Sequence, residues 1–381
     1  MNQRSGTSTR RGADVKSVEA GADGGEKTGD LDRGDTPPAS GRIRRFRLPR
    51  EASMLPALVV VLVLGSVLSP SFLTTQNFET VLKITSVVGL LAVGQTLVIL
   101  SGGGGIDLSV GAVAAVSAVV GALYAGYGLT AFIVAAVLTG SFIGLINGLG
   151  VSRAFLQPFI VTLATMTIAR GAAFYISGGT PLIVSMPDLN AISTSKLWFV
   201  PVPAVLFIGT AVVVHIVLRY TVWGREIYAV GGTEEAAYLS GVPVARRRLL
   251  VYIASGFLAG VAGVLLASFT ATADANAASG YELSAIAAVV VGGTALAGGQ
   301  GSIVGTMIGV LVIAFTGNIL NLMNVDPFMQ LLINGLIVLV AVSLEAQRRS
   351  GSSRGRLRGL AIMYGTIGVG ALIMFTVLAP S

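Results

Sequence analysis

The residues whose types could support chemistry are few, and the most prominent lie in a glycine-rich interval between two apolar runs. This interval, SGGGGIDLSVG, spans Ser101 to Gly111. Four consecutive glycines end the helix expected before it, and Asp107 and Ser109 precede the next apolar run. A carboxylate between apolar helices is costly to bury unless it pairs or faces water. Asp107 is therefore expected either to cap or bracket the next helix with Ser109, or to contact a transported substrate.

A second glycine-rich interval, GGTALAGGQGSIVG, spans Gly292 to Gly305. Both intervals follow an apolar helix, contain a glycine cluster with a few polar residues, and lead into a new helix. Paired interrupted helices in a transporter point to the substrate path. Neither interval is a phosphate loop, because no Gly-Lys-Ser/Thr follows the glycines. The residues expected along a translocation path are Gly102, Gly103, Gly104, Gly105, Asp107, Ser109, Gly292, Gly293, Gly298 and Gly299.

Arg170 is a further candidate, because it lies near the middle of an apolar run in TIARGAAFY. A lone arginine among apolar residues usually faces a bundle interior or a water-filled cavity. Three roles remain open for Arg170: a structural pair with Asp107, hydrogen bonds to backbone carbonyls, or a place in the translocation path.

The composition argues against catalysis and metal binding. The chain has no cysteine and a single histidine, His215, so thiolate and histidine-based metal sites are not expected. Paired carboxylates and an activated nucleophile are also lacking, which predicts no catalytic residues and no cofactor. The only lysines are Lys16, Lys27, Lys83 and Lys196. None follows a glycine, so the chain lacks a Walker A motif and any ATP hydrolysis must come from a separate subunit.

The elements that must position these residues are membrane helices. Hydrophobic residues make up 53% of the chain and charged residues 11%, and apolar runs of about twenty residues follow one another. The sequence predicts an all-α polytopic membrane protein. Eleven helices are expected at residues 54–69, 80–100, 106–126, 128–150, 158–177, 201–219, 249–270, 284–297, 302–320, 328–344 and 359–379. The segment 284–297 is short for a full crossing and could be broken or re-entrant, so the expectation is about 10–11 transmembrane helices.

Charge defines the domains and the orientation. Residues 1–50 are polar and end in five arginines within GRIRRFRLPR, which predicts a disordered, basic cytoplasmic tail. Residues 51–347 form the predicted transmembrane domain, and 348–381 a cytoplasmic basic loop followed by an extra helix. With the N-terminus inside, every arginine-rich loop is cytoplasmic, as in a bacterial plasma-membrane protein. The net charge of +7 does not predict nucleic-acid binding, because the arginines gather at helix ends beside membrane lipid.

Two further patterns concern packing and the largest polar loop. Glycines recur at every fourth position at Gly140, Gly144 and Gly148 and again at Gly256 and Gly260, a spacing that predicts close helix packing. The loop after Tyr220 contains GGTEEAAYLSGVP, in which Thr233 is a good N-cap. Glu234 and Glu235 favour the first helical turn and Gly241 its end, so a short, rigid amphipathic helix is expected.

Four motifs together resemble one family. They are GQTLVILSGGGGIDLSVGAV, PFIVTLATMTIARGAAFYISGGTP, GREIYAVGGTEEAAYLSGVPV and YELSAIAAVVVGGTALAGGQGSIVGTMIG. These are similar to the membrane permease of ribose-type monosaccharide ABC importers, in the branched-chain amino-acid/ribose permease superfamily. The resemblance implies a second permease copy in a homodimer, a cytoplasmic ABC ATPase and an extracytoplasmic sugar-binding protein. It also implies an ATPase-docking helix made of Gly231, Gly232, Thr233, Glu234, Glu235, Ala236, Ala237 and Gly241.

The chain departs from this family in two places. The family's usual GGIDLSVG carries two glycines where this chain has four, and the helix at 359–379 is additional. A branched-chain amino-acid permease is the sibling alternative, which GIDLSVG disfavours. A secondary transporter or channel is a more distant alternative, because only Asp107 offers an intramembrane carboxylate for coupling.

Overall fold

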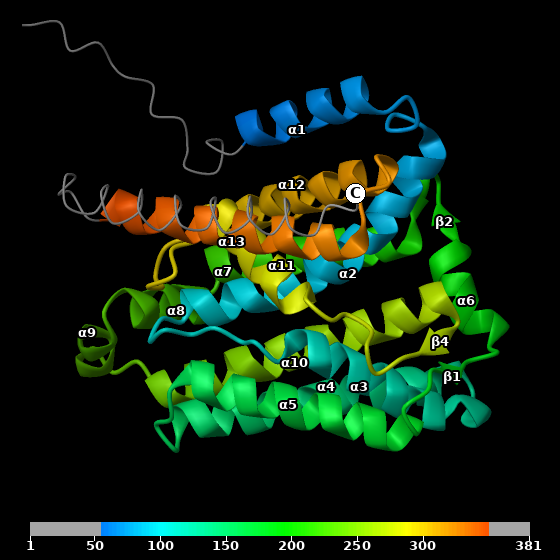
Figure 1. Cartoon of the computed structure of the whole chain (residues 1–381). Helices are drawn as coiled ribbons and strands as arrows, with labels where there is room; N and C mark the ends of the chain where they lie inside the picture. Colours follow the sequence, from blue (N-terminus) through cyan, green and yellow to red (C-terminus); the bar gives the residue numbers. More distant parts are fainter. Residues whose placement is uncertain (1–54, 350–381) are drawn as a thin grey trace, which may run out of the picture. The chain divides into compact units, whose positions relative to one another are not determined.

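The structure is a computed structural model that describes residues 55–349, and within that range it is almost entirely helical (Figure 1). The predicted N-terminal tail and the predicted helix at 359–379 lie outside the described residues. The helices are α1 (Leu55–Leu68), α2 (Thr75–Leu100), α3 (Val110–Leu123), η2 (Ala125–Tyr127), α4 (Leu129–Ser152), α5 (Pro158–Ser177), α6 (Pro187–Thr194), α7 (Val202–Tyr220), α8 (Val222–Gly232), α9 (Glu234–Leu239), α10 (Val244–Thr270), α11 (Tyr281–Val291), α12 (Ile303–Leu322) and α13 (Pro327–Arg349).

The predicted helix boundaries hold where sequence signals are strong. Helix α5 spans the predicted 158–177, with Pro158 at its start and left-handed Gly178 as its C-cap. The predicted helix at 284–297 was wrong at its end, because α11 stops at Val291 before the glycine turn. Helix α3 likewise begins at Val110 rather than at residue 106, and Ser109, its N-cap residue by position, makes no side-chain capping hydrogen bond.

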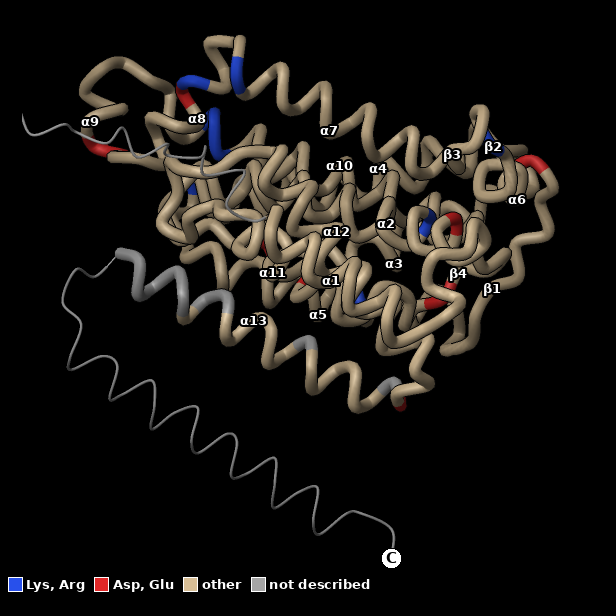
Figure 2. The backbone as a smooth tube through the Cα atoms, turned by 90° about the horizontal axis from the view of Figure 1, so that it is seen from above, with Lys and Arg blue, Asp and Glu red and all other residues tan. Residues whose placement is uncertain are grey.

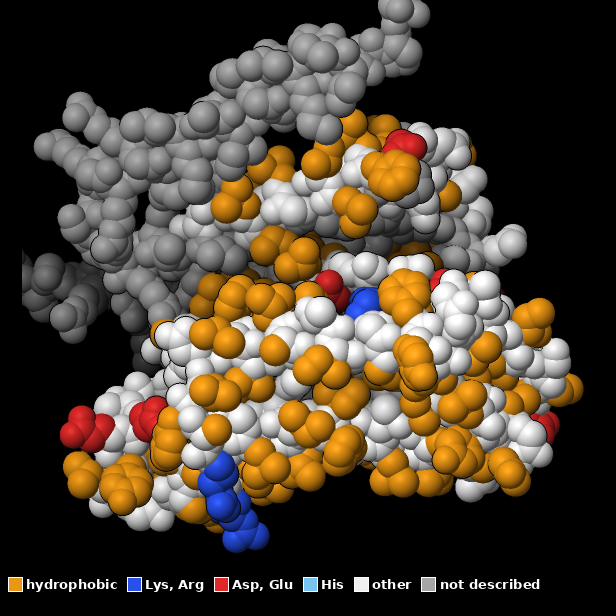
Figure 3. All heavy atoms as spheres, turned by 60° about the horizontal axis from the view of Figure 1, so that its bottom comes forward, with side chains coloured by type: hydrophobic (Ala, Val, Ile, Leu, Met, Phe, Trp, Pro, Cys, Tyr) orange, Lys and Arg blue, Asp and Glu red, His pale blue; other side chains and the backbone are white. Residues whose placement is uncertain are grey.

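The described helices confirm a polytopic membrane protein. Six are long and apolar enough to cross a membrane: α2, α4, α5, α7, α10 and α12. Shorter apolar helices are Leu55–Leu68, Val110–Leu123, Tyr281–Val291 and Phe328–Val340. Figure 3 shows apolar side chains spread over one face of the bundle, as expected of a surface in contact with lipid tails.

Helices α2 and α10 form the centre of the bundle. The most apolar window of α2 is 83% buried and that of α10 is 67% buried, whereas α4, α5 and α7 remain below 30%. Helix α4 packs along α10 through the predicted glycine rows. A Cβ on Gly144 would lie 3.1 Å from the Cα of Gly256, and a Cβ on Gly260 would lie 2.9 Å from the Cα of Val137. The predicted close helix packing is therefore confirmed.

The two ends of the bundle differ in structure. We call one the α9 end: it carries α8, α9 and the turns 101–109 and 292–302 (Figure 1). The other, the β4 end, carries α6 and two short antiparallel sheets of two strands each. Strand β1 (Leu182–Ile183) pairs with β4 (Thr272–Ala273), and β2 (Lys196–Leu197) pairs with β3 (Val200–Pro201). In Figure 2 the basic residues gather around α8 and α9.

Candidate functional site

The first glycine turn joins α2 to α3 and closes on itself. The N–H of Gly102 donates to the carbonyl of Ile99 at 3.0 Å, and the N–H of Gly105 donates to the carbonyl of Gly102 at 3.0 Å. Gly103 and Gly104 form an exposed tip, and a Cβ on Gly104 would meet no atom within 4 Å. Compared with the two glycines usual in the resembled family, the four glycines here make a longer turn. Its tip at Gly104 leaves open space where a Cβ would lie.

The second glycine turn joins α11 to α12. The N–H of Ala295 donates to the carbonyl of Gln300 at 2.8 Å, and the N–H of Gly298 donates to the carbonyl of Ala295 at 2.9 Å. Ser302 then caps α12, because its hydroxyl accepts from the N–H of Gly305 at 3.1 Å. The glycine cluster is thus a compact turn at the α9 end, followed by a well-capped helix.

The two turns and the end of α8 meet backbone against backbone. The N–H of Gly299 donates to the carbonyl of Leu100 at 3.1 Å, which joins the second turn to the first. A Cβ on Gly102 would lie 2.7 Å from the Cα of Gly231, and a Cβ on Gly231 would lie 2.5 Å from the N of Gly299. Gly298 lies equally close to Gly102. We call Gly102, Gly231, Gly298 and Gly299 the glycine junction.

The glycine junction requires glycine for two separate reasons. At Gly102, Gly298 and Gly299 the φ angles are +71°, +92° and +68°, a region that other residues seldom adopt. Gly231 is helical, so its requirement is space alone: any Cβ would collide with Leu100 and Gly299. Real side chains never approach backbone that closely, so an added methyl group must move one of the three segments.

Asp107 lies beside the junction in a buried polar network. Its Oδ1 accepts from the N–H of Ser109 at 3.0 Å and from the Ser109 hydroxyl at 2.6 Å, and its Oδ2 accepts from the Ser255 hydroxyl at 3.1 Å. The network continues through Asn147, whose Nδ2 donates to Ser109 Oγ at 2.9 Å. Thr165 then donates to Asn147 Oδ1 at 2.7 Å. Helices α3, α4, α5 and α10 are thereby joined by one chain of hydrogen bonds.

The backbone around Asp107 is held by two further side chains. When its amide is turned to satisfy both atoms, Gln95 donates to the carbonyl of Asp107 and accepts from its N–H, each at 3.1 Å. Thr162 donates to the carbonyl of Ile106 at 3.1 Å. The Asp107 residue is 2% exposed, and both oxygens of its carboxyl accept hydrogen bonds, from Ser109 and from Ser255. These contacts are those expected of the structural bracket, one of the two roles predicted for Asp107.

Arg170 lies away from Asp107. Its Nη1 donates to the carbonyls of Ala275 and Ala277, the latter at 3.1 Å, in the segment between β4 and α11. Within residues 55–349 no cation forms an ion pair with Asp107, so the pairing of Arg170 with Asp107 was wrong and the carbonyl alternative is confirmed. Figure 3 shows basic and acidic side chains close together in a hollow near the middle of the face that it views.

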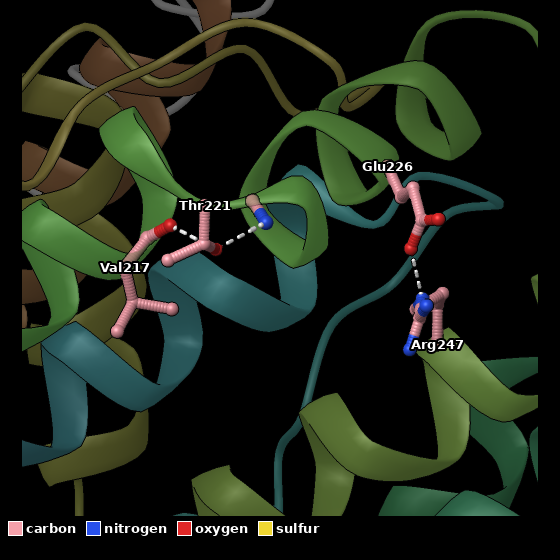
Figure 4. A network of polar contacts seen from close by, with 5 residues as sticks. Val217, Thr221, Glu226 and Arg247 are labelled. Atoms are coloured by element: carbon pink, nitrogen blue, oxygen red, sulfur yellow. Dashed lines mark hydrogen bonds and ion pairs between the residues drawn. The ribbon is translucent and has the colours of Figure 1, made fainter.

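Two contacts near the start of helix α8 anchor it to α7 and to α10. The hydroxyl of Thr221 accepts from the N–H of Gly224 at 3.1 Å and donates to the carbonyl of Val217 at 2.6 Å, which ties α8 to the end of α7 (Figure 4). Glu226 forms an ion pair with Arg247 at the start of α10 (Figure 4). The sequence analysis predicted only a short helix in this loop and missed α8, although the buried Gly224, Ile227 and Val230 recur at a helical spacing.

Helix α9 projects from the α9 end, in the position that the sequence predicted for a short helix. Thr233 is its N-cap residue by backbone position, but its side chain makes no capping hydrogen bond. Glu234 instead forms a bidentate pair with Arg248, with N–O distances of 2.9 and 2.7 Å. Tyr238 and Leu239 are 70% and 77% exposed. The C-terminal end of α9 therefore exposes two large side chains, Tyr238 and Leu239, while its first turn is held by the ion pair of Glu234 with Arg248.

The structure brings most of the predicted site residues together. Gly102, Gly298 and Gly299 meet in the junction with Gly231 of the predicted docking segment, and Gly232 contacts Gly299. Asp107 and Ser109 lie in the adjacent polar network, whereas Gly292 packs against Gly305 on α12. Arg170 is apart from them. Sequence reasoning missed Gln95, Asn147, Thr165 and Ser255, which are ordinary polar residues in apolar helices, and burial among such runs is the signal that could have identified them.

Metal binding has no support in the described part of the chain, where no group of three or more His, Asp or Glu residues could hold an ion.

Comparison with known proteins gives a consistent assignment. Residues 77–342 match the family described as branched-chain amino acid transport system / permease component. The ribose import permease protein RbsC of Bacillus subtilis is 40% identical over 295 residues, which cover 76% of this chain and 91% of that protein. RbsC of Haemophilus influenzae is 38% identical, covering 79% and 94%, and the L-arabinose ABC transporter permease protein AraH of Azospirillum brasilense is 35% identical, covering 82% and 92%. No solved structure matches the chain.

Proposed function

The chain belongs to the branched-chain amino acid transport system / permease component family, and we propose that it is the permease subunit of an ABC importer for a monosaccharide or a related small sugar. The printed names of the relatives, which describe import of ribose and transport of L-arabinose, support a sugar rather than an amino acid. A separate ATPase provides the energy, an extracytoplasmic binding protein delivers the sugar, and a second copy of the chain completes the path.

The arginine distribution supports the orientation in this proposal. At the α9 end lie Arg153, Arg219, Arg225, Arg246, Arg247 and Arg248. The β4 end carries Asp188, Asp274 and Asp326 with one lysine, Lys196, paired to Glu79. Basic residues favour the cytoplasmic side of a membrane. The α9 end is therefore cytoplasmic and faces the ATPase, and the β4 end faces the binding protein.

The observation that carries the mechanism is the glycine junction. It connects the docking segment directly to the turns that end both interrupted helix pairs, with backbone contacts at Gly102, Gly231 and Gly299. Where backbones touch directly, no side chain can rotate to absorb a movement of one segment against another. When the ATPase moves α9 and α8, the displacement therefore passes to α2–α3 and α11–α12 together, and these pairs shift to open or close the path.

The role of Asp107 follows from its burial. In this conformation the carboxyl is enclosed by Ser109, Ser255 and the surrounding helices, so it does not meet a sugar. It instead keeps the start of α3 fixed to α10 while the adjacent turn moves. Arg170, in the C-terminal half of α5, holds the segment between β4 and α11 and is the candidate for the outer part of the path.

An uptake assay tests the substrate class. Cells lacking this gene, with and without a plasmid copy of the chain, would be compared for uptake of labelled ribose, L-arabinose and leucine. We expect the plasmid to restore uptake of a sugar and to leave leucine uptake unchanged. Restored leucine uptake without any sugar uptake would assign the chain to the amino-acid branch of its family.

A further inference from the structure

A cavity at the α9 end lies outside both the junction and the docking tip. Its volume is about 260 Å³, and it is lined by residues from three elements. The end of α7 contributes His215 and Arg219, α8 contributes Arg225 and Tyr228, and the start of α12 contributes Ser302. The hydroxyl of Tyr228 donates to the carbonyl of Gly301 at 3.0 Å, which joins α8 to the start of α12 at the cavity wall.

The charges of this cavity are of one sign. Arg219 and Arg225 are exposed, and neither forms an ion pair within residues 55–349. Glu226, the carboxylate next to Arg225 in sequence, is already paired with Arg247. No acidic residue lines the cavity, and α12, a helix of 20 residues, begins there. The guanidinium of Arg219 lies over the ring of Tyr220, 6.0 Å from its centroid, which leaves its N–H groups able to donate. Two guanidinium groups without a carboxylate partner, beside a helix N-terminus, attract an anion with several oxygen atoms.

The cavity lies where a membrane-facing surface ends. Along α7 the apolar side chains of Val212, Val213 and Ile216 are exposed, and Tyr220 at its end is 67% exposed. In a membrane protein such a surface contacts lipid tails, and a tyrosine and an arginine at the helix end mark the headgroup level. An anion in the cavity would therefore lie level with lipid phosphates.

We propose that this cavity binds the phosphate of an anionic phospholipid headgroup in the leaflet at the α9 end. The cavity of about 260 Å³ is smaller than pockets for drug-sized ligands, which start at roughly 300 Å³, so it suits a phosphate group better than a whole larger ligand. A soluble phosphate compound carries the same chemistry. The lipid is favoured because the apolar face of α7 leads to the cavity, and a lipid tail can lie along that face while its phosphate reaches both arginines.

The test uses the full-length chain in nanodiscs of phosphatidylcholine with a small fraction of spin-labelled phosphatidylglycerol. The motionally restricted fraction of the label measures the preference for the anionic lipid. Arg219→Gln with Arg225→Gln removes two charges from the cavity. Arg153→Gln with Arg246→Gln is the matched control, because it removes two exposed charges from the same end outside the cavity. We expect the preference for the labelled anionic lipid to fall at least about fivefold in the cavity variant and to stay unchanged in the control variant.

Four results would overturn the proposal. An equal loss in both double variants would reduce the effect to general surface charge, and an unchanged preference in the cavity variant would exclude the site. Displacement of the labelled lipid by millimolar inorganic phosphate would assign the cavity to a soluble phosphate compound instead. If the cavity variant kept its lipid preference but lost an associated ATPase, the cavity would belong to a protein interface.

Discussion

Gly102 and Gly231 lie so close that a Cβ on Gly102 would come within 2.7 Å of the Gly231 Cα, although 129 positions separate them in the sequence. The first belongs to the turn after α2 and the second to the last turn of α8. Because Gly299 also contacts Gly231, one small region joins both glycine turns to the segment that leads into α9. This arrangement relates the predicted docking segment to the predicted path.

The proposed orientation can be tested with single cysteines, because the chain contains none. Ser240 is exposed next to α9, and Ser195 is exposed at the β4 end. We expect Ser195→Cys to react with an impermeant maleimide in intact cells. Ser240→Cys should react only after the membrane is opened. The reverse pattern would place α9 outside the cell and exclude its contact with a cytoplasmic ATPase.

The exposed tip of α9 is expected to bind the ATPase. Tyr238→Ser with Leu239→Ser should abolish co-purification of the ATPase and leave the amount of inserted chain unchanged, because both side chains project away from the fold. Trp198→Ser with Phe199→Ser is the matched control, since both residues are 88% exposed at the β4 end. Retained ATPase in the α9 variant would contradict the docking assignment. Glu235 is a better charge probe than Glu234, which is paired with Arg248.

Asp107 is expected to tolerate substitution by asparagine better than by alanine. The observed hydrogen bonds of the Asp107 carboxyl show which of its contacts each substitution keeps. Asparagine keeps an oxygen for Ser109, and its amide can donate to Ser255, so uptake should stay near normal. Asp107→Ala leaves the buried donors of Ser109 and Ser255 without an acceptor, which costs about 1–3 kcal/mol of folding free energy for each unpaired group. This variant should therefore lose both thermal stability and uptake. Equal loss in the two variants would show that the charge itself is required.

Arg170 and Asp107 are expected to act independently. Arg170→Gln removes the donor to the carbonyls of Ala275 and Ala277 and should destabilise the purified chain by about 1–3 kcal/mol. Because no ion pair joins the two residues, adding Asp107→Asn should change stability additively within about 0.5 kcal/mol. Rescue of Arg170→Gln by Asp107→Asn in thermal unfolding would instead reveal electrostatic coupling between them.

The sequence predicted the parts of this molecule that local signals determine. Helix α5 was predicted at its observed bounds because proline and glycine mark its ends, and the glycine rows of α4 and α10 predicted their packing. Contacts between distant segments could not be predicted in this way. The pairing of β1 with β4 and the meeting of Gly102, Gly231 and Gly299 depend on how the helices are arranged in space, which single-sequence patterns do not determine.

The sequence predicted most of the residues of the candidate site, but only part of how they contact one another. The glycine turns, Asp107 and the short α9 helix were identified from residue types and spacing. The pairing of Arg170 with Asp107 was not found, because a charge in an apolar helix can be satisfied equally well by carbonyls, and the sequence does not distinguish the two. The polar partners of Asp107 were missed because serine, threonine and asparagine are too common to indicate a network.

Neighbouring glycines in α8 provide the most direct test of the central claim, that the docking segment drives transport through the glycine junction. A Cβ on Gly231 would collide with Leu100 and lie 2.5 Å from the N of Gly299, whereas one on Gly232 would meet no atom within 4 Å. Both residues are helical, so alanine suits the backbone at each position equally. Insertion and ATPase binding would be checked for both variants before uptake is compared.

The measurement is ATP-driven sugar uptake by Gly231→Ala and Gly232→Ala at matched amounts in the membrane. An overpacked contact costs about 1–3 kcal/mol, so Gly231→Ala is expected to transport roughly tenfold or more slowly while still binding the ATPase. Gly232→Ala is expected to transport at nearly the rate of the unaltered chain. Equal uptake by the two variants would contradict transmission through the glycine junction.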